Sequence, residues 1–476
     1  MIVCRFTRDL RLEDHAALAT AADRGPVLPA LVVDGELNAS LRRSPRRAAF
    51  FAGAVRALDE ALRERGSRLV VRRGEAPEAL VRLARESGAS GIVWSARYDG
   101  AGARADLSLR ASLEEAGVHA QCVHDAPAIG PEEIARSPDG GYRAFQPYFE
   151  RWRSLPIASY DRPILLHFAQ PESESEALPA AREFGATSAA EDAAPAHALE
   201  RLQAFLDGAA RGYAADRYLP AVDGTSRLCA HLSFGTLALR TAVRATQRCL
   251  ENPFLLNEER RSLRLFLRSL ALRDFFLQLA WFHPETDDAA LQVRMREFAF
   301  ARQHPHLDAW REGRTGYPLV DAGIRQLRKT GWMHPHVRSV AASFLCFDLG
   351  VDWRVGRETW DRFEVEDDAA IASGNWQWIA GIGADLVQYP RIYNPRRQQL
   401  RFDPLGEYVR RWIPELAHAP LHGARERVPM LPLYDAASYP SPVVDHAREA
   451  RAFLERYRSY AAPRRGGAQG SPATGG

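Results

Sequence analysis

The strongest constraint on the fold is a change of hydrophobic pattern partway along the chain. In residues 1–125, short β-branched runs alternate with longer amphipathic stretches, and these runs are MIVCRF, VLPALVVD, RLVVRRG, GIVWSARY and HAQCVHD. Strands that alternate with helices form a parallel sheet covered on both faces. Residues 44–66 give the clearest helix signal, because Ser44 can cap the first turn, Pro45 suits that turn and Gly66 follows the end. We therefore expect an α/β domain with a Rossmann-like parallel sheet, although no GxGxxG fingerprint follows the first run.

After this domain the composition and the periodicity change twice. Residues 126–200 are rich in Pro, Ala, Ser and Glu, which predicts an interdomain connector on the surface. Residues 201–460 are predicted to form an all-α domain, and residues 461–476 a disordered tail. The helical spacing is clearest for Leu263, Phe266, Leu267, Leu270 and Phe275.

The bulk properties exclude several classes of protein. The 476 residues allow two or three domains, and a net charge of +3 means that nucleic-acid affinity must come from a local patch. The five cysteines form no CxxC pair, so we expect neither a disulfide framework nor a metal site, and a reducing cytoplasm fits. No apolar run reaches the roughly 18 residues of a membrane helix, and no signal peptide is expected.

Two segments of the helical half combine donors and aromatic rings. GTSRLCAHLSFG, residues 224–235, offers Thr225, Ser226 and Arg227 to an anionic phosphate, while a simple helix N-cap is the alternative. GRTGYPLVDAGIRQLRKTGWMHPHVRS, residues 313–339, contains a turn, a helix and a second turn. Its Trp332, His334 and Arg338 are spaced to approach one neighbourhood.

Two later segments carry acids, tryptophans and arginines. EVEDDAAIASGNWQW places carboxylates just before Trp376 and Trp378. YPRIYNPRRQQLRF sets arginines, among them Arg396 and Arg397, among tyrosines. Guanidinium groups beside aromatic rings are suited to hold phosphates and to stack on bases.

Seven motifs in order resemble the DNA photolyase/cryptochrome family over residues 1–430. They are FTRDLRLEDHAAL, GTSRLCAHLSFG, GRTGYPLVDAGIRQL, TGWMHPHVR, DWRVG, GNWQW and RIYNP. The pattern is nearest to the class I cyclobutane pyrimidine dimer photolyases. The resemblance implies an α/β antenna domain joined to an all-α domain that binds FAD. A second antenna chromophore is also implied, but its identity stays open between a deazaflavin, another flavin and an empty pocket.

The resemblance also implies a set of residues that contact FAD. Arg338 and Glu366 should form an ion pair at the polar edge of the flavin, and Ala372 stands where the family has an asparagine beside flavin N5. The full set is Tyr213, Thr225, Ser226, Arg227, Leu228, Cys229, Phe266, Arg273, His334, Arg338, Glu366, Asp367, Asp368 and Ala372.

Tryptophans at family positions imply an electron path to the flavin. The path starts at Trp376 and passes through Trp353, whereas the alternative is that both rings only fill the core. The third family position is Phe300, which is much harder to oxidise. The surface end of the path is therefore expected to be rerouted through Trp360 or to be inefficient.

The positions that contact the lesion depart from the family. Ser269 and Leu272 replace a Glu and a Trp, and Pro335 and His336 replace an Asn–Arg pair. Trp378 and Arg217 match family contacts to DNA, and Gln398 is still present in the basic loop, where Arg396 and Arg397 are expected to contact phosphates. The resemblance thus implies a cytoplasmic, monomeric photolyase acting on UV-damaged DNA, with single strands as the easier substrate. The alternative is a cryptochrome-type photoreceptor with little or no repair, and a non-catalytic FAD-binding protein is a more distant one.

Overall fold

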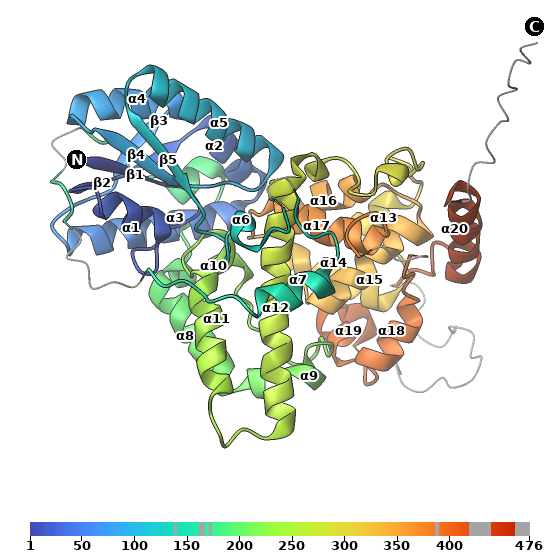
Figure 1. Ribbon diagram of the computed structural model, residues 1–476. Helices are drawn as coiled ribbons and strands as arrows, with labels where there is room; N and C mark the ends of the chain where they lie inside the picture. Colours follow the sequence, from blue (N-terminus) through green and yellow to red (C-terminus); the bar gives the residue numbers. More distant parts are fainter. Residues whose placement is uncertain (138–139, 161–166, 171–173, 386–389, 418–438, 462–476) are drawn as a thin grey trace, which may run out of the picture.

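A five-stranded parallel sheet forms the first part of the protein (Figure 1). The computed structural model describes residues 1–137, 140–160, 167–170, 174–385, 390–417 and 439–461. The strands are β1 (Ile2–Phe6), β2 (Val27–Val33), β3 (Val70–Arg73), β4 (Gly91–Ser95) and β5 (His119–Val123). Their order across the sheet is β3-β2-β1-β4-β5, and every pair is parallel. The five predicted strands and the α/β class are confirmed.

Helices cover both faces of this sheet. They are α1 (Ala16–Ala22), α2 (Gly35–Arg43), α3 (Pro45–Arg63), α4 (Ala76–Ser87) and α5 (Gly100–Glu115). Because side chains alternate along a strand, Val3 packs with α4 and α5, whereas Phe6 packs with α1 and α3. The Ser44 side chain accepts a hydrogen bond from the Arg47 N–H, so the predicted cap of α3 is confirmed.

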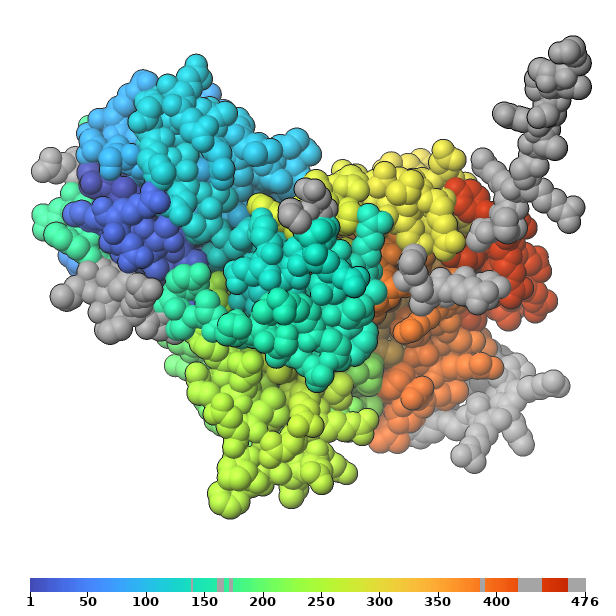
Figure 2. All heavy atoms as spheres, in the orientation of Figure 1, coloured from blue at the N-terminus to red at the C-terminus, as the bar shows by residue number. Residues whose placement is uncertain are grey.

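The segment expected to be a surface connector enters the core instead. It contains α6 (Pro131–Ile134) and α7 (Phe145–Trp152), and Tyr148 and Trp152 are buried. The Trp152 indole donates a hydrogen bond of 2.8 Å to Asp274 on α12. In Figure 2 the teal atoms around α7 lie across the front, between the α/β part and the helical part. A surface position for residues 126–200 is therefore wrong where these aromatic rings anchor the chain.

The rest of the described chain is helical, as predicted. Its helices are α8 (Pro195–Asp207), α9 (Tyr213–Asp216), α10 (Cys229–Ser233), α11 (Leu239–Leu250), α12 (Asn257–Phe282), α13 (Leu307–Glu312), α14 (Pro318–Thr330), α15 (Pro335–Ser343), α16 (Trp353–Asp361), α17 (Ala369–Ala380), α18 (Pro395–Phe402), α19 (Glu407–Trp412) and α20 (His446–Ala461). A π turn at Phe344–Asp348 follows α15. Of the predicted tail, residues 462–476 lie outside the described residues. None of the described helices has the length and apolar character that a membrane crossing requires.

Ion pairs join the sheet domain to the helical part. Arg8, just after β1, lies 2.7 Å from Asp367, and Arg47 of α3 lies 2.6 Å from Asp361 at the end of α16. Arg47 also donates two hydrogen bonds to the Glu366 carbonyl oxygen. The acidic segment 361–368 is thus held against the sheet domain on one side. Its other side faces α15.

Candidate flavin site

Arg338 and the acidic segment form the ion pair that the sequence predicts. Arg338 lies on α15, and its Nη1 is 3.3 Å from Glu366 Oε2. The same Nη1 is 3.2 Å from Glu364 Oε1, so two carboxylates share one guanidinium group. Burial alone would lower the pKa of Arg338, but these two carboxylates raise it above its usual value. Arg338 therefore stays charged and can balance negative charge on a bound ring.

The loop before α10 leaves its hydroxyl groups available. Helix α10 begins at Cys229 with Leu228 as its N-cap and without a side-chain cap, so neither Thr225 nor Ser226 caps it. Within the described part of the chain, these two hydroxyls have no hydrogen-bond partner. The structure thus disfavours the N-cap alternative and leaves the two hydroxyls available to phosphate oxygens.

Arg227 gives this loop its shape. Its φ of 52° lies in the left-handed region, which is uncommon for a residue other than glycine. Its guanidinium stacks on Trp332 at 4.5 Å and pairs with Asp223 at 2.9 Å. Such backbone conformations are often found where a ligand is held.

His334 presents an unpaired ring nitrogen at the start of α15. Its Nδ1 accepts a hydrogen bond from the His336 N–H, and its backbone N–H donates to Gln326. Burial lowers the pKa of His334 to about 3, so the ring is neutral at pH 7. Its Nε2 is buried without a partner among the described residues, as is Nε of Arg338.

These orphaned polar atoms are what a polar ligand would satisfy, because buried donors and acceptors in proteins are normally paired. Tyr213 lies nearby at the start of α9, with its hydroxyl 3.5 Å from Ser269 Oγ. Asp368 caps α17 and is bonded to Arg273 of α12. Ala372, in the first turn of α17, contributes no polar side-chain atom. The residues present therefore fit FAD.

Three residues of the predicted FAD set have other partners. Phe266 packs against Phe205, with ring centroids 4.7 Å apart, and Leu228 is buried in the same core. Asp367 lies between Arg8 and Arg47 of the sheet domain, so its carboxylate holds the domains together. Local sequence could not distinguish Asp367 from Glu366, because the difference depends on which residue faces the other domain.

The tryptophans form a contact that differs from the predicted order. The rings of Trp376 and Trp360 have centroids 4.3 Å apart, and Trp360 stacks on Trp310 at 6.1 Å. Trp353 is buried, but among the described residues no aromatic ring stacks on it, and its ring lies against Arg354 and Arg357. Trp310 was not predicted, since its motif REFAFARQHPHLDAW pointed to Phe300.

The lesion-contact positions on α12 offer little to a substrate. Ser269 Oγ donates to the Phe266 carbonyl oxygen of its own helix at 2.7 Å. Leu272 is half-buried against the core that contains Phe276. Trp378 touches Phe276 in an edge-to-face contact with centroids 6.1 Å apart. Of these positions, Trp378 alone offers an aromatic face for a base.

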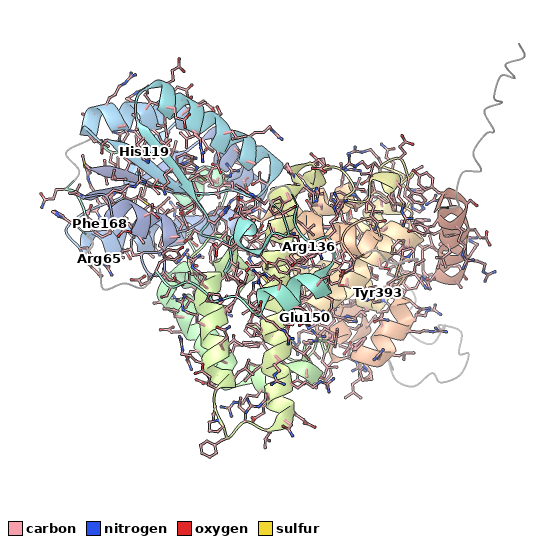
Figure 3. All side chains as sticks on the ribbon, in the orientation of Figure 1. Arg65, His119, Arg136, Glu150, Phe168 and Tyr393 are labelled. Carbon is pink, nitrogen blue, oxygen red and sulfur yellow. The ribbon has the colours of Figure 1, made fainter. Side chains whose placement is uncertain are left out.

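Two predicted DNA contacts bind each other. His336 Nε2 lies 3.0 Å from Gln398 Oε1 on α18. The His336 ring is enclosed by Phe402, Tyr218 and Tyr393, the last of which is labelled in Figure 3. Burial lowers the pKa of His336 to about 4, so this ring is neutral at pH 7. His336 therefore joins α15 to α18 within a packed aromatic cluster.

The remaining predicted DNA contacts lie at the surface. Arg396 and Arg397 are exposed on α18, and Pro335 is exposed at the first turn of α15. Arg217 donates to the Tyr218 hydroxyl at 2.6 Å, while its Nε is buried without a partner among the described residues. Two exposed guanidinium groups on one short helix are a suitable contact for a phosphate backbone.

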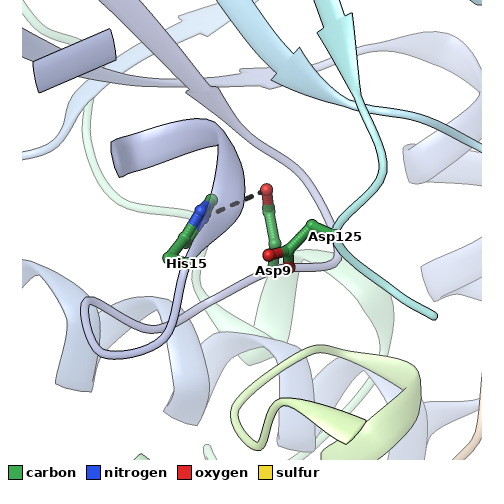
Figure 4. A group of neighbouring side chains, drawn as sticks. All are labelled: Asp9, His15 and Asp125. Atoms are coloured by element: carbon green, nitrogen blue, oxygen red, sulfur yellow. Dashed lines mark ion pairs between the residues drawn. The ribbon is translucent and has the colours of Figure 1, made fainter. Parts of the chain in front are cut away.

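A buried cluster in the sheet domain has the composition of a metal site but other partners. Ligand atoms of Asp9, His15 and Asp125 lie within 4.8 Å of one another (Figure 4). Asp125 accepts hydrogen bonds from Arg11 and Arg240, each at 2.8 Å. Two guanidinium groups bonded to one carboxylate disfavour a cation there.

Family models match both parts of the chain. The model described as DNA photolyase matches residues 2–168, and the FAD binding domain of DNA photolyase matches residues 266–459. The chain is 35% identical to the deoxyribodipyrimidine photo-lyase of Halobacterium salinarum, covering 95% of this chain and 98% of that protein. It is 36% identical to that of Streptomyces griseus, covering 96% and 98%.

Solved structures agree with these matches. A class III photolyase from Agrobacterium tumefaciens aligns with a TM-score of 0.82 and 30% identity, covering 96% of this chain and 97% of that one. An archaeal photolyase from Sulfolobus tokodaii with two FAD molecules gives 0.80 and 27%, covering 96% and 99%. A cryptochrome from Synechocystis gives 0.83 and 25%, covering 96% and 98%.

Proposed function

The chain belongs to the DNA photolyase/cryptochrome family, and from this we propose that it is a blue-light-driven deoxyribodipyrimidine photolyase that binds FAD. The observation that carries the proposal is the set of unpaired polar atoms on His334 and Arg338, beside Glu366, at the positions of the flavin motifs. When bound, FAD supplies the light absorption and the electron that splits a pyrimidine dimer.

The chain's own residues hold and tune that cofactor. Thr225 and Ser226 would donate to the phosphates, and the charged Arg338 would balance negative charge on the reduced ring. The neutral His334 adds no second positive charge. Stabilisation of a reduced, negatively charged ring thus depends on the guanidinium group of Arg338 and on its carboxylate partners.

Electrons would reach the site from Trp310 through Trp360 and then through Trp376, which is the direct donor to the flavin. This order follows from the ring contacts, because electron transfer slows steeply with distance and the Trp376–Trp360 centroids are 4.3 Å apart. An electron lost by Trp376 is replaced from Trp360, and a thiol in solution restores the chain. Trp353 stays as the alternative second donor from the family pattern.

DNA binds across the exposed face of α18, where Arg396 and Arg397 contact phosphates. UV-damaged DNA is the substrate, with single strands favoured because flipping a base out of a duplex costs energy. The protein acts as a monomer in the cytoplasm. A second antenna chromophore of unassigned identity is part of the proposal, supported by the two FAD molecules of the Sulfolobus tokodaii photolyase.

The test combines cofactor content with repair. The purified protein should be yellow with about one FAD per chain, and Arg338→Ala should lose it, whereas Arg311→Ala, which removes the partner of the exposed Asp308 on α13, should not. Blue light should then restore thymines in a dimer-containing oligonucleotide. A colourless protein that FAD does not reconstitute would refute the cofactor assignment, and a yellow protein without repair would refute the photolyase activity alone.

A second candidate function is a cryptochrome-type photoreceptor. Ser269, which bonds to its own helix, and Leu272, which packs into the core, favour it because neither grips a lesion. The Synechocystis cryptochrome has the same overall fold. If the protein lacks only these two lesion contacts, the double change Ser269→Glu with Leu272→Trp should raise repair of duplex dimers. Fast repair by the unmodified protein would rule this candidate out as the main role.

A further inference from the structure

Glu364 and Glu366 share a single positive partner beside the flavin site. Arg338 Nη1 lies 3.2 Å from Glu364 and 3.3 Å from Glu366, and the two carboxylate side chains are 12% and 15% exposed. One carboxylate would be enough to neutralise Arg338.

The surrounding charges leave the second carboxylate without a cation of its own. From α3, Arg47 faces the segment, but it bonds to Asp361 and to the backbone carbonyl of Glu366. From α16, Asp361 adds negative charge, and from α10 the Cys229 thiol lies against Glu366. Within the part of the chain that the structure describes, Arg338 is the one cation paired with Glu364.

Two adjacent carboxylates with one shared cation cannot both stay ionised cheaply. Like charges at a partly buried site disfavour double ionisation, so the pKa of one carboxyl group of such a pair is raised. The nearby Ala372 has no side-chain group that could donate a proton or take one up. Proton exchange beside the ring therefore falls to the acid pair.

We propose that Glu364 and Glu366 form a proton-binding site that takes up a proton from solvent, up to one per flavin, when a negative charge is placed on the flavin ring held by Arg338. The step converts one carboxylate into a carboxylic acid and breaks no other bond. The electron that charges the ring comes from the tryptophan path or an external reductant. The inference rests on the proposed FAD site, and it assigns to Glu364 a role beyond pairing with Arg338.

The pKa of Glu364 lies in the range that this proton uptake needs. Burial raises the pKa of Glu364, Arg338 lowers it, and Glu366 raises it again, which places it at about 7. Added negative charge on a ring close to Arg338 would raise it further. Glu364 would then pass from partly to fully protonated as the ring is reduced.

The first measurement is an infrared pH titration of the protein as purified, in the dark. The wild-type minus Glu364→Gln difference spectrum should contain a protonated-carboxyl band that titrates near neutral pH, whereas Asp274 and Asp348, whose pKa values burial raises to about 7 and about 6, contribute equally to both proteins and cancel. Glu358→Gln is the control, because Glu358 is exposed on α16 and pairs only loosely with Arg302 at 3.8 Å. A difference spectrum without such a band, or with a band no larger than that between the wild type and Glu358→Gln, would overturn the proposal.

The second measurement counts the protons taken up per FAD reduced, with an indicator dye in weak buffer at pH 7.5. Glu364→Gln should take up roughly half a proton per FAD less than the wild type or Glu358→Gln. Equal uptake in all three would overturn the coupling. If Glu364→Gln fails to fold, Glu364→Asp should keep the infrared band with a shifted midpoint, and an unshifted midpoint would assign the band to another residue. The dark titration needs no FAD, so its result is separate from a failure of the proposed function.

Discussion

At the scale of single residues, the contact between Trp376 and Trp360 decides how the flavin site is supplied with electrons. We expect Trp360→Phe to slow blue-light reduction of FAD in a thiol buffer at least tenfold, and Trp353→Phe to slow it less. The physical reason is that Trp360 touches Trp376 at 4.3 Å, whereas Trp353 lies against two arginines. The rate is read from the loss of flavin absorbance. A large effect of Trp353→Phe with none of Trp360→Phe would show instead that Trp353 is the second electron donor, as in the family pattern.

The residue scale also shows what sequence could predict. The Arg338–Glu366 pair was predicted, because both residues lie in motifs whose spacing is shared with the family. The pairing of Glu364 with Arg338 was not, although the dense acids of FEVEDD were a visible signal. An acid in such a run faces the flavin site or the sheet domain according to tertiary packing, which the local sequence does not encode. The same holds for Asp367, whose partner Arg8 is 359 residues away.

At the scale of elements, α18 should carry much of the electrostatic attraction to DNA. Arg396→Ala with Arg397→Ala should weaken binding to duplex DNA, damaged or not. The slope of log affinity against log salt should fall by about 1.8, because each phosphate that an arginine neutralises adds about 0.9 to that slope. Fluorescence anisotropy at several salt concentrations measures it. Arg448→Ala is the control, because this exposed arginine on α20 pairs with Glu449. An unchanged slope in the double variant would mean that DNA does not contact these two arginines of α18.

Helix α12 anchors the connector through one carboxylate. Asp274 accepts hydrogen bonds from the Trp152 indole and from the backbone N–H groups of Ala128 and Ile129. Asp274→Asn would turn an amide donor toward these donors, so we expect the free energy of unfolding to fall by about 2–3 kcal/mol. Urea denaturation measures the change, with Glu150→Gln on the surface of α7 as the control. A loss no larger than that of the control would mean that other contacts hold the connector.

The elements differ in how well sequence predicts them. The strands were predicted because each is a short apolar run bounded by turn residues, and Ser44 was predicted because its capping chemistry is local. Residues 126–200 were misjudged because their average composition is polar and small. The buried residues Tyr148 and Trp152 are few, and only the partner helix α12 shows that they are core.

At the scale of the whole molecule, the two parts are held together by ion pairs that also position the flavin site. Arg8 and Arg47 bind Asp367 and Asp361, and the same segment carries Glu364 and Glu366 toward Arg338. Docking of the sheet domain and the geometry of the acid pair are therefore coupled. A substitution that breaks these ion pairs should therefore change the environment of the bound flavin.

That coupling predicts a pH-dependent stability with a definite sign. Burial alone would raise the pKa of Asp367, but Arg8 and Arg47 lower it to about 2. A carboxyl whose pKa is depressed on folding stabilises the protein above its unfolded pKa of about 3.9, and this contribution disappears as the pH falls toward 2. The depression corresponds to about 2–3 kcal/mol.

Asp367→Asn should therefore lower the free energy of unfolding by about 2–3 kcal/mol at pH 7, and the difference from wild type should shrink steadily below pH 4. Urea unfolding from pH 7 down to the lowest pH with a folded baseline measures this difference. Asp308→Asn, at an exposed pair on α13, should show almost no difference at any pH. The flavin absorption band should also shift in Asp367→Asn, because the segment that carries Glu366 loses its tie to Arg8. A difference that stays constant with pH would mean that Asp367 acts through its shape and not through its charge.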